Sequence, residues 1–185
     1  MLLRAAALAL LICASAPAAA QEQPAPSPAA ISLPVLAADL AYGFCPMLMN
    51  GEAALTANAD LIALGFPATA EPGGNARLPD FALLGQTTAS GDVTVGGISQ
   101  SICQVSVIGE QAEAALVTLR SGLTDLGLAL EPDAANSGPV PQGDGIVESL
   151  KMPLPEGGVV RVQFLQASLG SGAPMASFQI MFQEQ

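Results

Sequence analysis

The chain has 185 residues, and its 5 lysines and arginines against 16 aspartates and glutamates give a formal net charge of −11 at pH 7. It contains no histidine and no tryptophan. The lack of histidine excludes a Ser-His-Asp triad, a Cys-His pair and histidine-ligated zinc. The few basic residues form no electrostatic footprint for nucleic acid, so we expect no nucleic-acid partner.

Residues 1–20 have the pattern of a secretory signal peptide. Arg4 supplies a positive charge, residues 5–12 are uncharged and apolar, and Ala18-Ala19-Ala20 offers small residues for cleavage after Ala20. The apolar run is shorter than the ~20 residues that a membrane-spanning helix needs. A buried N-terminal helix and a lipoprotein signal at Cys13 are the alternatives. We predict removal of residues 1–20 and a periplasmic or secreted protein whose mature chain has no transmembrane segment.

Two cysteines, Cys45 and Cys103, remain after such a cleavage. Thiols of an exported protein meet an oxidising compartment, where a pair of them commonly forms a structural disulfide. We therefore predict a Cys45–Cys103 bond. The alternative is a redox C-x-x-C motif, but Tyr42 and Leu48 occupy the positions where its second cysteine would stand.

The first third of the mature chain is mainly helical in pattern. Residues 21–30 (QEQPAPSPAA) are rich in proline and predict a disordered or polyproline-like tether before a single domain over residues 31–185. Apolar spacing predicts a helix from Leu33 to Cys45 that Pro46 breaks or restarts. Asn50 is a suitable N-cap for a second helix over residues 51–64, which Gly65 would end.

Strand patterns then occur in two groups around a third helix, predicted over residues 110–126. The first group covers residues 81–88, 93–95 and 98–108, with Gly96-Gly97 as one of the turns. In its last run the face of Cys103 and the opposite face are about equally apolar, so the buried face stays open. The second group covers residues 146–154, 159–167 and a final strand that reaches Gln183, and its first two strands are joined by a turn at residues 155–158.

Alternation in the last two strands separates an inner from an outer face. Val160, Val162 and Phe164 point inward, as do Ala176, Phe178, Ile180 and Phe182, while Arg161, Gln163, Ser177, Gln179 and Gln183 point outward. A helix followed by three strands occurs twice, at residues 51–108 and 110–183. The grouping predicts an α+β fold with an antiparallel sheet of about five to seven strands, two to three helices packed on one face, and one disulfide.

The carboxylates do not form an obvious acid–base pair. Glu110 and Glu113 stand at the start of the third helix, where the helix dipole favours negative charge. Asp92, Asp133 and Asp144 lie in segments rich in turn-forming residues, where aspartate commonly shapes the turn. A calcium loop would need a denser set of oxygen ligands. We predict no catalytic residue, no metal site and no cofactor.

Two short patterns support other functions. Ser149 and Lys151 lie on the same face of a strand, where a desolvated lysine would accept the serine proton in a hydrolase. Met47 and Met49 offer soft sulfur ligands of the kind that bind Cu(I), although methionines in apolar segments also fill cores.

The expected function is a non-catalytic binding or interaction module with an unknown envelope protein or small ligand as its partner. The outward face that carries Arg161, Gln163, Ser177 and Gln179 is suited to a polar partner, and Arg77 stands alone in a neutral loop. The alternatives are a histidine-free hydrolase that uses carboxylates or the Ser149/Lys151 pair, and a copper carrier that uses Met47 and Met49.

Overall fold

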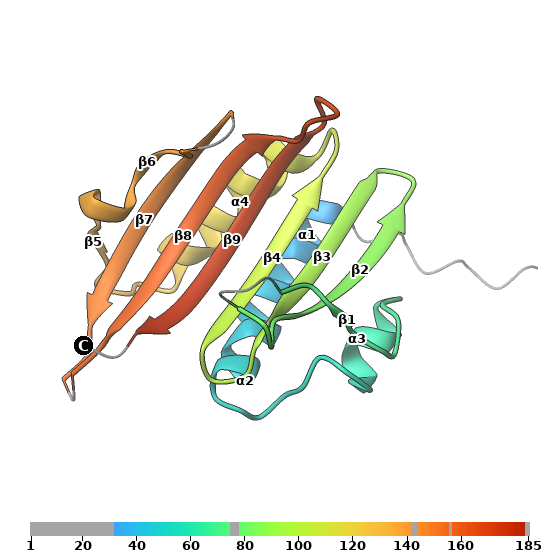
Figure 1. Ribbon diagram of the computed structural model, residues 1–185, viewed down its shortest axis with the longest axis horizontal. Helices are drawn as coiled ribbons and strands as arrows, with labels where there is room; N and C mark the ends of the chain where they lie inside the picture. Colours follow the sequence, from blue (N-terminus) through green and yellow to red (C-terminus); the bar gives the residue numbers. More distant parts are fainter. Residues whose placement is uncertain (1–31, 75–77, 142–143, 156, 184–185) are drawn as a thin grey trace, which may run out of the picture. The chain divides into compact units, whose positions relative to one another are not determined.

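The computed structural model describes residues 32–74, 78–141, 144–155 and 157–183. The predicted signal peptide and tether therefore lie outside the described residues, as does Arg77. The fold is α+β, as the grouping of strands and helices predicts. Its centre is an antiparallel sheet with helices on one face. The helices α1 (Leu33–Asp39) and α4 (Ala112–Asp125) lie together behind that sheet in Figure 1.

The sheet is built from two groups of three long strands. The strands run side by side in the order β2-β3-β4-β9-β8-β7, and all neighbours are antiparallel. Their bounds are Ala82–Thr88 for β2, Gly91–Ile98 for β3, Ile102–Ile108 for β4, Gly145–Pro153 for β7, Val159–Ser168 for β8 and Pro174–Gln183 for β9.

Three two-residue strands extend the sheet, so the nine strands of the described residues exceed the predicted five to seven. β1 (Glu71–Pro72) pairs with β2, while β5 (Glu131–Pro132) and β6 (Gly138–Pro139) both pair with β7. A short 3-10 turn, Ala134–Asn136, joins β5 to β6. The segment from β5 to β6 occupies the outer edge of β7, where unpaired backbone groups would otherwise invite a further strand.

The first helical segment is longer than the predicted Leu33–Cys45. It runs as α1 (Leu33–Asp39), a π-helical turn (Leu40–Phe44) and α2 (Cys45–Met49). Pro46 lacks a backbone N–H and stands in the first turn of α2, so the chain continues as a helix beyond it. The second long helix, α4 (Ala112–Asp125), confirms the helix predicted over residues 110–126.

The helix predicted over residues 51–64 is wrong except for one short turn. Asn50 is the C-cap of α2 and not an N-cap, and Gly51 follows it with φ +75°. Ala57 also has a positive φ, of 56°, which a helix does not accommodate. Asn58 then caps α3 (Ala59–Ala63) by accepting hydrogen bonds from two backbone N–H groups of that helix.

The turn predicted at Gly96-Gly97 is also wrong, because both glycines lie within β3. The turn comes later, at residues 99–101, where Gln100 has φ +62°. Each glycine makes room on one face of the sheet. A Cβ on Gly96 would lie 2.8 Å from the Phe81 ring, and a Cβ on Gly97 would lie 3.0 Å from Leu48 of α2.

The two halves of the chain follow the same order of elements. The first half places α1 before β2, β3 and β4, and the second places α4 before β7, β8 and β9. The third strand of each half, β4 and β9, pairs with the other at the centre of the sheet. The first half therefore begins at Leu33, and not at the residue-51 helix expected from the sequence.

The core lies between the two long helices and the sheet. Cys103, Val105 and Val107 of β4 face the helices, which settles the face that the sequence leaves open. Cys45 and Cys103 form the predicted disulfide, and both are fully buried. Within the described residues, no helix is long and apolar enough to span a membrane.

Tyr42 fixes the contact between the first helical segment and α4. Its hydroxyl donates a hydrogen bond to the carbonyl of Leu119, and burial raises the pKa of Tyr42. Its ring packs edge-on against Phe178, with the ring centroids 5.5 Å apart. Gly122 leaves room for this ring, because a Cβ there would lie 2.9 Å from Tyr42 Cδ2.

Candidate functional site

The face of the sheet opposite the long helices carries a continuous group of uncharged polar side chains. Because side chains alternate along each strand, residues that face away from the helices line up across neighbouring strands. We name this group the polar band, and its members are Gln104, Ser106, Ser149, Gln163, Ser177 and Gln179.

The strand register places the polar band in two rows. Gln104 of β4 pairs with Gln179 of β9, which pairs with Gln163 of β8, which in turn pairs with Ser149 of β7. In the next row, Ser106 pairs with Ser177. Neighbouring strands lie about 4.8 Å apart, so the row from Gln104 to Ser149 spans about 14 Å across the sheet and its three amides span about 10 Å.

Buried serines hold the amide side chains in place. Ser106 and Ser177 are each 4% exposed, and Ser149 is 1% exposed. Gln104 Nε2 donates to Ser106 Oγ at 3.1 Å, and Ser106 Oγ donates to Ser177 Oγ at 3.0 Å. The sheet face that the sequence predicts to be exposed to solvent is therefore exposed only in part. Its serine hydroxyls are more buried than the amides and form hydrogen bonds within the protein.

The amides also form hydrogen bonds with their neighbours and still have donor and acceptor groups without a partner among the described side chains. Gln179 Nε2 donates to Gln104 Oε1, and Gln163 Nε2 donates to Ser149 Oγ, both at 3.4 Å. Among the described side chains, none donates a hydrogen bond to Oε1 of Gln163 or of Gln179. Each amide also has a second N–H, so the row offers both donors and acceptors to a ligand.

Two hollows open on the polar band and share Gln104. The smaller, of about 110 Å³, lies between the amides and the side chains of Val147 and Leu165. The larger, of about 320 Å³, has Gln104, Ser106 and Thr94 on the sheet side. Its remaining walls are apolar or glycine residues, and they are Gly73, Gly74, Leu78, Phe81, Leu83, Ile108 and Met175.

No charged side chain among the described residues lines either hollow. This neutrality stands out in a chain with a formal net charge of −11. A buried charge needs a partner to offset the loss of its hydration, and the described lining supplies none. The described lining combines hydrogen-bonding edges with apolar walls.

Charges gather beside the band, at its β7 side. Arg161 Nε donates to Asp133 Oδ2 at 2.7 Å, and both side chains are largely buried, at 14% and 5% exposure. The hydrogen bond from Arg161 is the main cause that holds the pKa of Asp133 below its usual value, and a hydrogen bond from Asn136 acts in the same direction. Asp133 thus anchors the β5–β6 segment over the sheet, beyond the turn-shaping role expected of it.

The Ser149/Lys151 pair does not form a nucleophile arrangement in the described structure. Ser149 is buried and its hydroxyl accepts a hydrogen bond from Gln163, while its backbone N–H donates to Ser137 Oγ at 2.9 Å. No hydrogen bond joins Ser149 to Lys151 among the described residues. Ser149 instead belongs to the polar band.

The methionines of the copper-carrier alternative pack against the core. Met47 and Met49 of α2 are partly buried beside the hydrophobic cluster, and Cys45 next to them is in the disulfide. In the described part of the chain, histidine, cysteine, aspartate and glutamate form no group of three or more that is suited to a metal ion.

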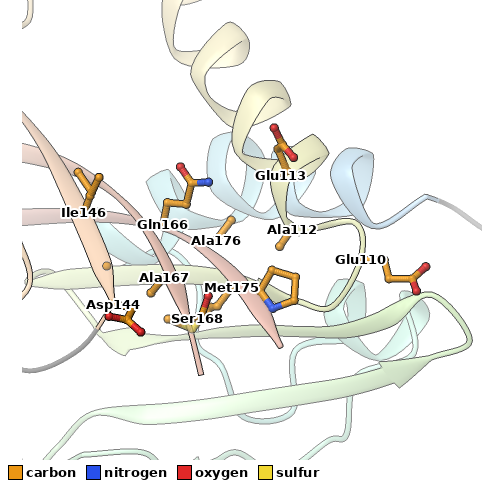
Figure 2. A pocket seen from close by; sticks show the side chains of 12 residues that line it. Glu110, Ala112, Glu113, Asp144, Ile146, Gln166, Ala167, Ser168, Met175 and Ala176 are labelled. Atoms are coloured by element: carbon orange, nitrogen blue, oxygen red, sulfur yellow. The ribbon is translucent and has the colours of Figure 1, made fainter. Parts of the chain in front are cut away.

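A larger hollow, of about 420 Å³, lies where the start of α4 meets the ends of β7, β8 and β9. It contains the carboxylates of Glu110, Glu113 and Asp144, which Figure 2 shows on separate sides of the hollow. They do not converge on one point, as an acid–base pair would require. Asp92, also expected in a turn, lies in β3 opposite Ile108.

The sequence predicts the outward orientation of three of the six polar-band members, places Ser149 on a strand face shared with Lys151, and misses the other two. Gln163, Ser177 and Gln179 were expected to face outward, and they do. Gln104 and Ser106 were missed because the face of Cys103 could not be assigned. The predicted disulfide would have been enough to assign this face. A Cys103 bonded to a helix must face the helices, and Gln104 and Ser106 must then face the other side.

Comparisons with protein-family models, with curated proteins and with solved structures found no match for this chain.

Proposed function

We propose that this protein is an exported, non-catalytic binding module that holds an uncharged polar ligand on its polar band. The observation that carries the proposal is the row of amide side chains with unused donors and acceptors, next to two hollows that no charged side chain lines among the described residues. Ligand sites commonly combine apolar walls with a few fixed polar groups.

A periplasmic or secreted location is part of the proposal. It is supported by the signal-peptide pattern of residues 1–20 and by the Cys45–Cys103 disulfide, because stable disulfides form mainly in oxidising compartments. The absence of histidine from the sequence and the burial of Ser149 support a non-catalytic role over the hydrolase alternative.

A thermal-shift experiment tests the proposal on the mature protein. Two probe sets of equal size and concentration are compared: neutral amides and polyols, and carboxylates with alkylammonium ions. A ligand that binds only the folded state raises Tm. We expect the neutral set to raise Tm more than the charged set.

Substitutions separate binding from general solvent effects, because polyols also stabilise proteins by exclusion from the surface. The Gln104→Ala/Gln179→Ala double variant should lose the specific part of the shift. Gln166→Ala is the matched control, since Gln166 lies on β8 outside the band and is exposed. A larger shift with the charged set, or an equal shift in all variants, would overturn the proposal.

A further inference from the structure

The two edges of the sheet are covered to different extents. β7 forms one edge, where β5 and β6 pair with it along most of its length (Figure 1). β2 forms the other edge, and β1 pairs only with its residues 82 and 83. Among the described residues, no backbone hydrogen bond reaches β2 from outside the sheet beyond Leu83. We call the outer side of residues 84–88 the free edge.

Gly85 and Thr87 turn their backbone groups toward the free edge. Antiparallel strands are hydrogen-bonded through alternate residues, and the two-residue turn between Thr88 and Gly91 makes Thr88 one of those bonded to β3. Phe81, an even number of residues away from Gly85, accepts a backbone hydrogen bond from the β1 side. Gly85 and Thr87 share this orientation, and both are exposed. Each therefore presents an N–H donor and a carbonyl acceptor to the outside of the sheet.

The sequence of β2 contains none of the residues that usually protect such an edge. Natural edge strands commonly carry charges or proline, or are covered by another segment of the chain. Residues 82–88 are ALLGQTT, with no charged residue and no proline. A strand of this composition is suited to pair with a further extended segment.

The three described edge strands show which kind of segment covers an edge in this protein. Each is a dipeptide that ends in proline, and they are Glu71–Pro72, Glu131–Pro132 and Gly138–Pro139. The residue after each proline donates its N–H to the neighbouring strand, and these residues are Gly73, Asp133 and Val140. Proline itself has no N–H, and in each case it occupies the alternate position, which faces away from the sheet.

Residues 23–29 repeat this pattern three times. Their sequence is QPAPSPA, so Ala25, Ser27 and Ala29 each follow a proline. Residues two apart in a strand turn the same way, so these three would present their backbone groups to one side and the prolines to the other. A residue before a proline is restricted to extended conformations, which lowers the entropy lost when the segment pairs with a strand.

The described chain begins close to the free edge. Leu33 Cδ1 lies 3.3 Å from the position that a Cβ on Gly91 would take, and Gly91 pairs with Thr88 at the end of β2. An extended chain covers about 3.3 Å per residue, so the four steps from Ala29 to Leu33 span about 13 Å. Residues 23–29 can therefore reach β2 and would run toward its hairpin end, parallel to it.

We propose that residues 23–29 pair with the free edge of their own chain as a further, parallel strand. In a parallel pair, one residue of the added strand bridges Gly85 and Thr87, and the residues two before and two after it bond to their remaining groups. Ala25, Ser27 and Ala29 have this spacing. The polyproline-like form expected of this segment from the sequence is already extended, with dihedral angles near those of a strand.

The free edge is separate from the polar band. β2 lies two strands away from β4, the nearest strand that contributes a member of the band. The added strand would thus cover the β2 edge as β5 and β6 cover that of β7, and its presence does not depend on a ligand at the polar band.

Hydrogen exchange of backbone amides in the mature protein, followed by nuclear magnetic resonance, tests this proposal. Ala25→Pro/Ser27→Pro removes two donors and places proline rings toward β2. The amides of Gly85 and Thr87 should exchange about 10-fold faster in this variant than in wild type. The amide of Leu83, which pairs with Glu71, is the internal reference and should exchange at the same rate in both proteins.

Pro24→Ala/Pro26→Ala is the matched control, because these prolines face away from the sheet in the proposed strand. It should keep the slow exchange of Gly85 and Thr87. Fast exchange of both amides in wild type, or equal exchange in the two double variants, would overturn the proposal. Slow exchange that appears only as the protein concentration rises would also overturn it, because the strand would then come from a second copy.

A peptide experiment tests the proline alternation itself. The acetylated peptide QEQPAPSPAA, added to Ala25→Pro/Ser27→Pro, should restore slow exchange at Gly85 and Thr87. A peptide of the same composition with its three prolines in succession should not. Restoration by both peptides, or by neither, would contradict recognition of the alternating pattern by the free edge.

Discussion

The two faces of the sheet differ in chemistry although the same strands build both. On β9, Phe178 faces the helices and packs against Tyr42 and Phe164, while the adjacent Gln179 faces away and contacts Gln104. The helix face is closed by apolar packing and a disulfide. The open face holds neutral polar groups that are only partly used. Stability therefore depends mainly on one face, and the proposed binding site occupies the other.

The largest expected effect comes from Phe178, which is 2% exposed. Phe178→Ala removes a buried ring from the contact with Tyr42 and Phe164, and we expect a loss of about 3–5 kcal/mol in the free energy of unfolding. Gln179→Ala, one residue along on the open face, should cost about 1 kcal/mol or less. Urea unfolding measures both, and equal losses would contradict the division of roles between the faces.

The disulfide is the next test of the helix face. It closes a loop with a sequence separation of 58 residues. Cys45→Ala/Cys103→Ala should lower the free energy of unfolding by about 2–4 kcal/mol, because the unfolded chain gains conformational freedom. Reduction of the wild-type protein after denaturation should raise its mass by two hydrogens. Free thiols at both positions in protein isolated from its natural compartment would refute the export part of the account.

The close packing of α4 on Tyr42 predicts a loss of stability smaller than that from removal of the disulfide. Gly122→Ala places a methyl group against the Tyr42 ring, and such overpacking typically costs about 1–3 kcal/mol. Gly43→Ala is the control, because a Cβ at Gly43 meets nothing within 4 Å. It should be neutral or slightly stabilising in thermal unfolding. Equal changes in Tm for the two variants would contradict the tight contact between the first helical segment and α4.

A further effect, expected from Asp133 on the open face, depends on pH. The folded-state pKa of Asp133 is lowered, mainly by the hydrogen bond from Arg161, so its contribution to stability is present above the unfolded pKa of about 3.9. That contribution is lost as pH falls through the lower folded pKa. The Tm difference between wild type and Asp133→Asn should be constant from pH 5 to 7 and shrink below pH 4. A difference that grows on acidification would contradict the ion pair.

Much of the fold follows from periodicity. The alternation of Val162 and Phe164 with Arg161 and Gln163 predicts which face of β8 is buried, and apolar spacing predicts α4. The signal-peptide pattern and the two cysteines that would remain after cleavage predict the disulfide. These features depend on the periodicity of neighbouring residues or on the chemistry of one residue type. Both can be read from a single sequence.

The failures come from residues whose conformation depends on distant partners. Asn50-Gly51 fits either end of a helix, and only the chain's path after α2 makes it a C-terminal stop with φ +75° at Gly51. Gly96-Gly97 resembles a turn, but these glycines admit Phe81 on one face and Leu48 on the other. The Asp133–Arg161 pair joins segments 28 residues apart, which no local pattern indicates.

The central claim is that the open face, through its glutamine amides, binds neutral ligands. The most direct test follows the side-chain NH₂ signals of Gln104, Gln163, Gln179 and Gln166 by nuclear magnetic resonance during titration with the neutral amide probes. The account predicts that the signals of Gln104, Gln163 and Gln179 shift in a saturable way while that of Gln166 stays in place. Unchanged signals from the three band amides, or a shift of Gln166 alone, would contradict it.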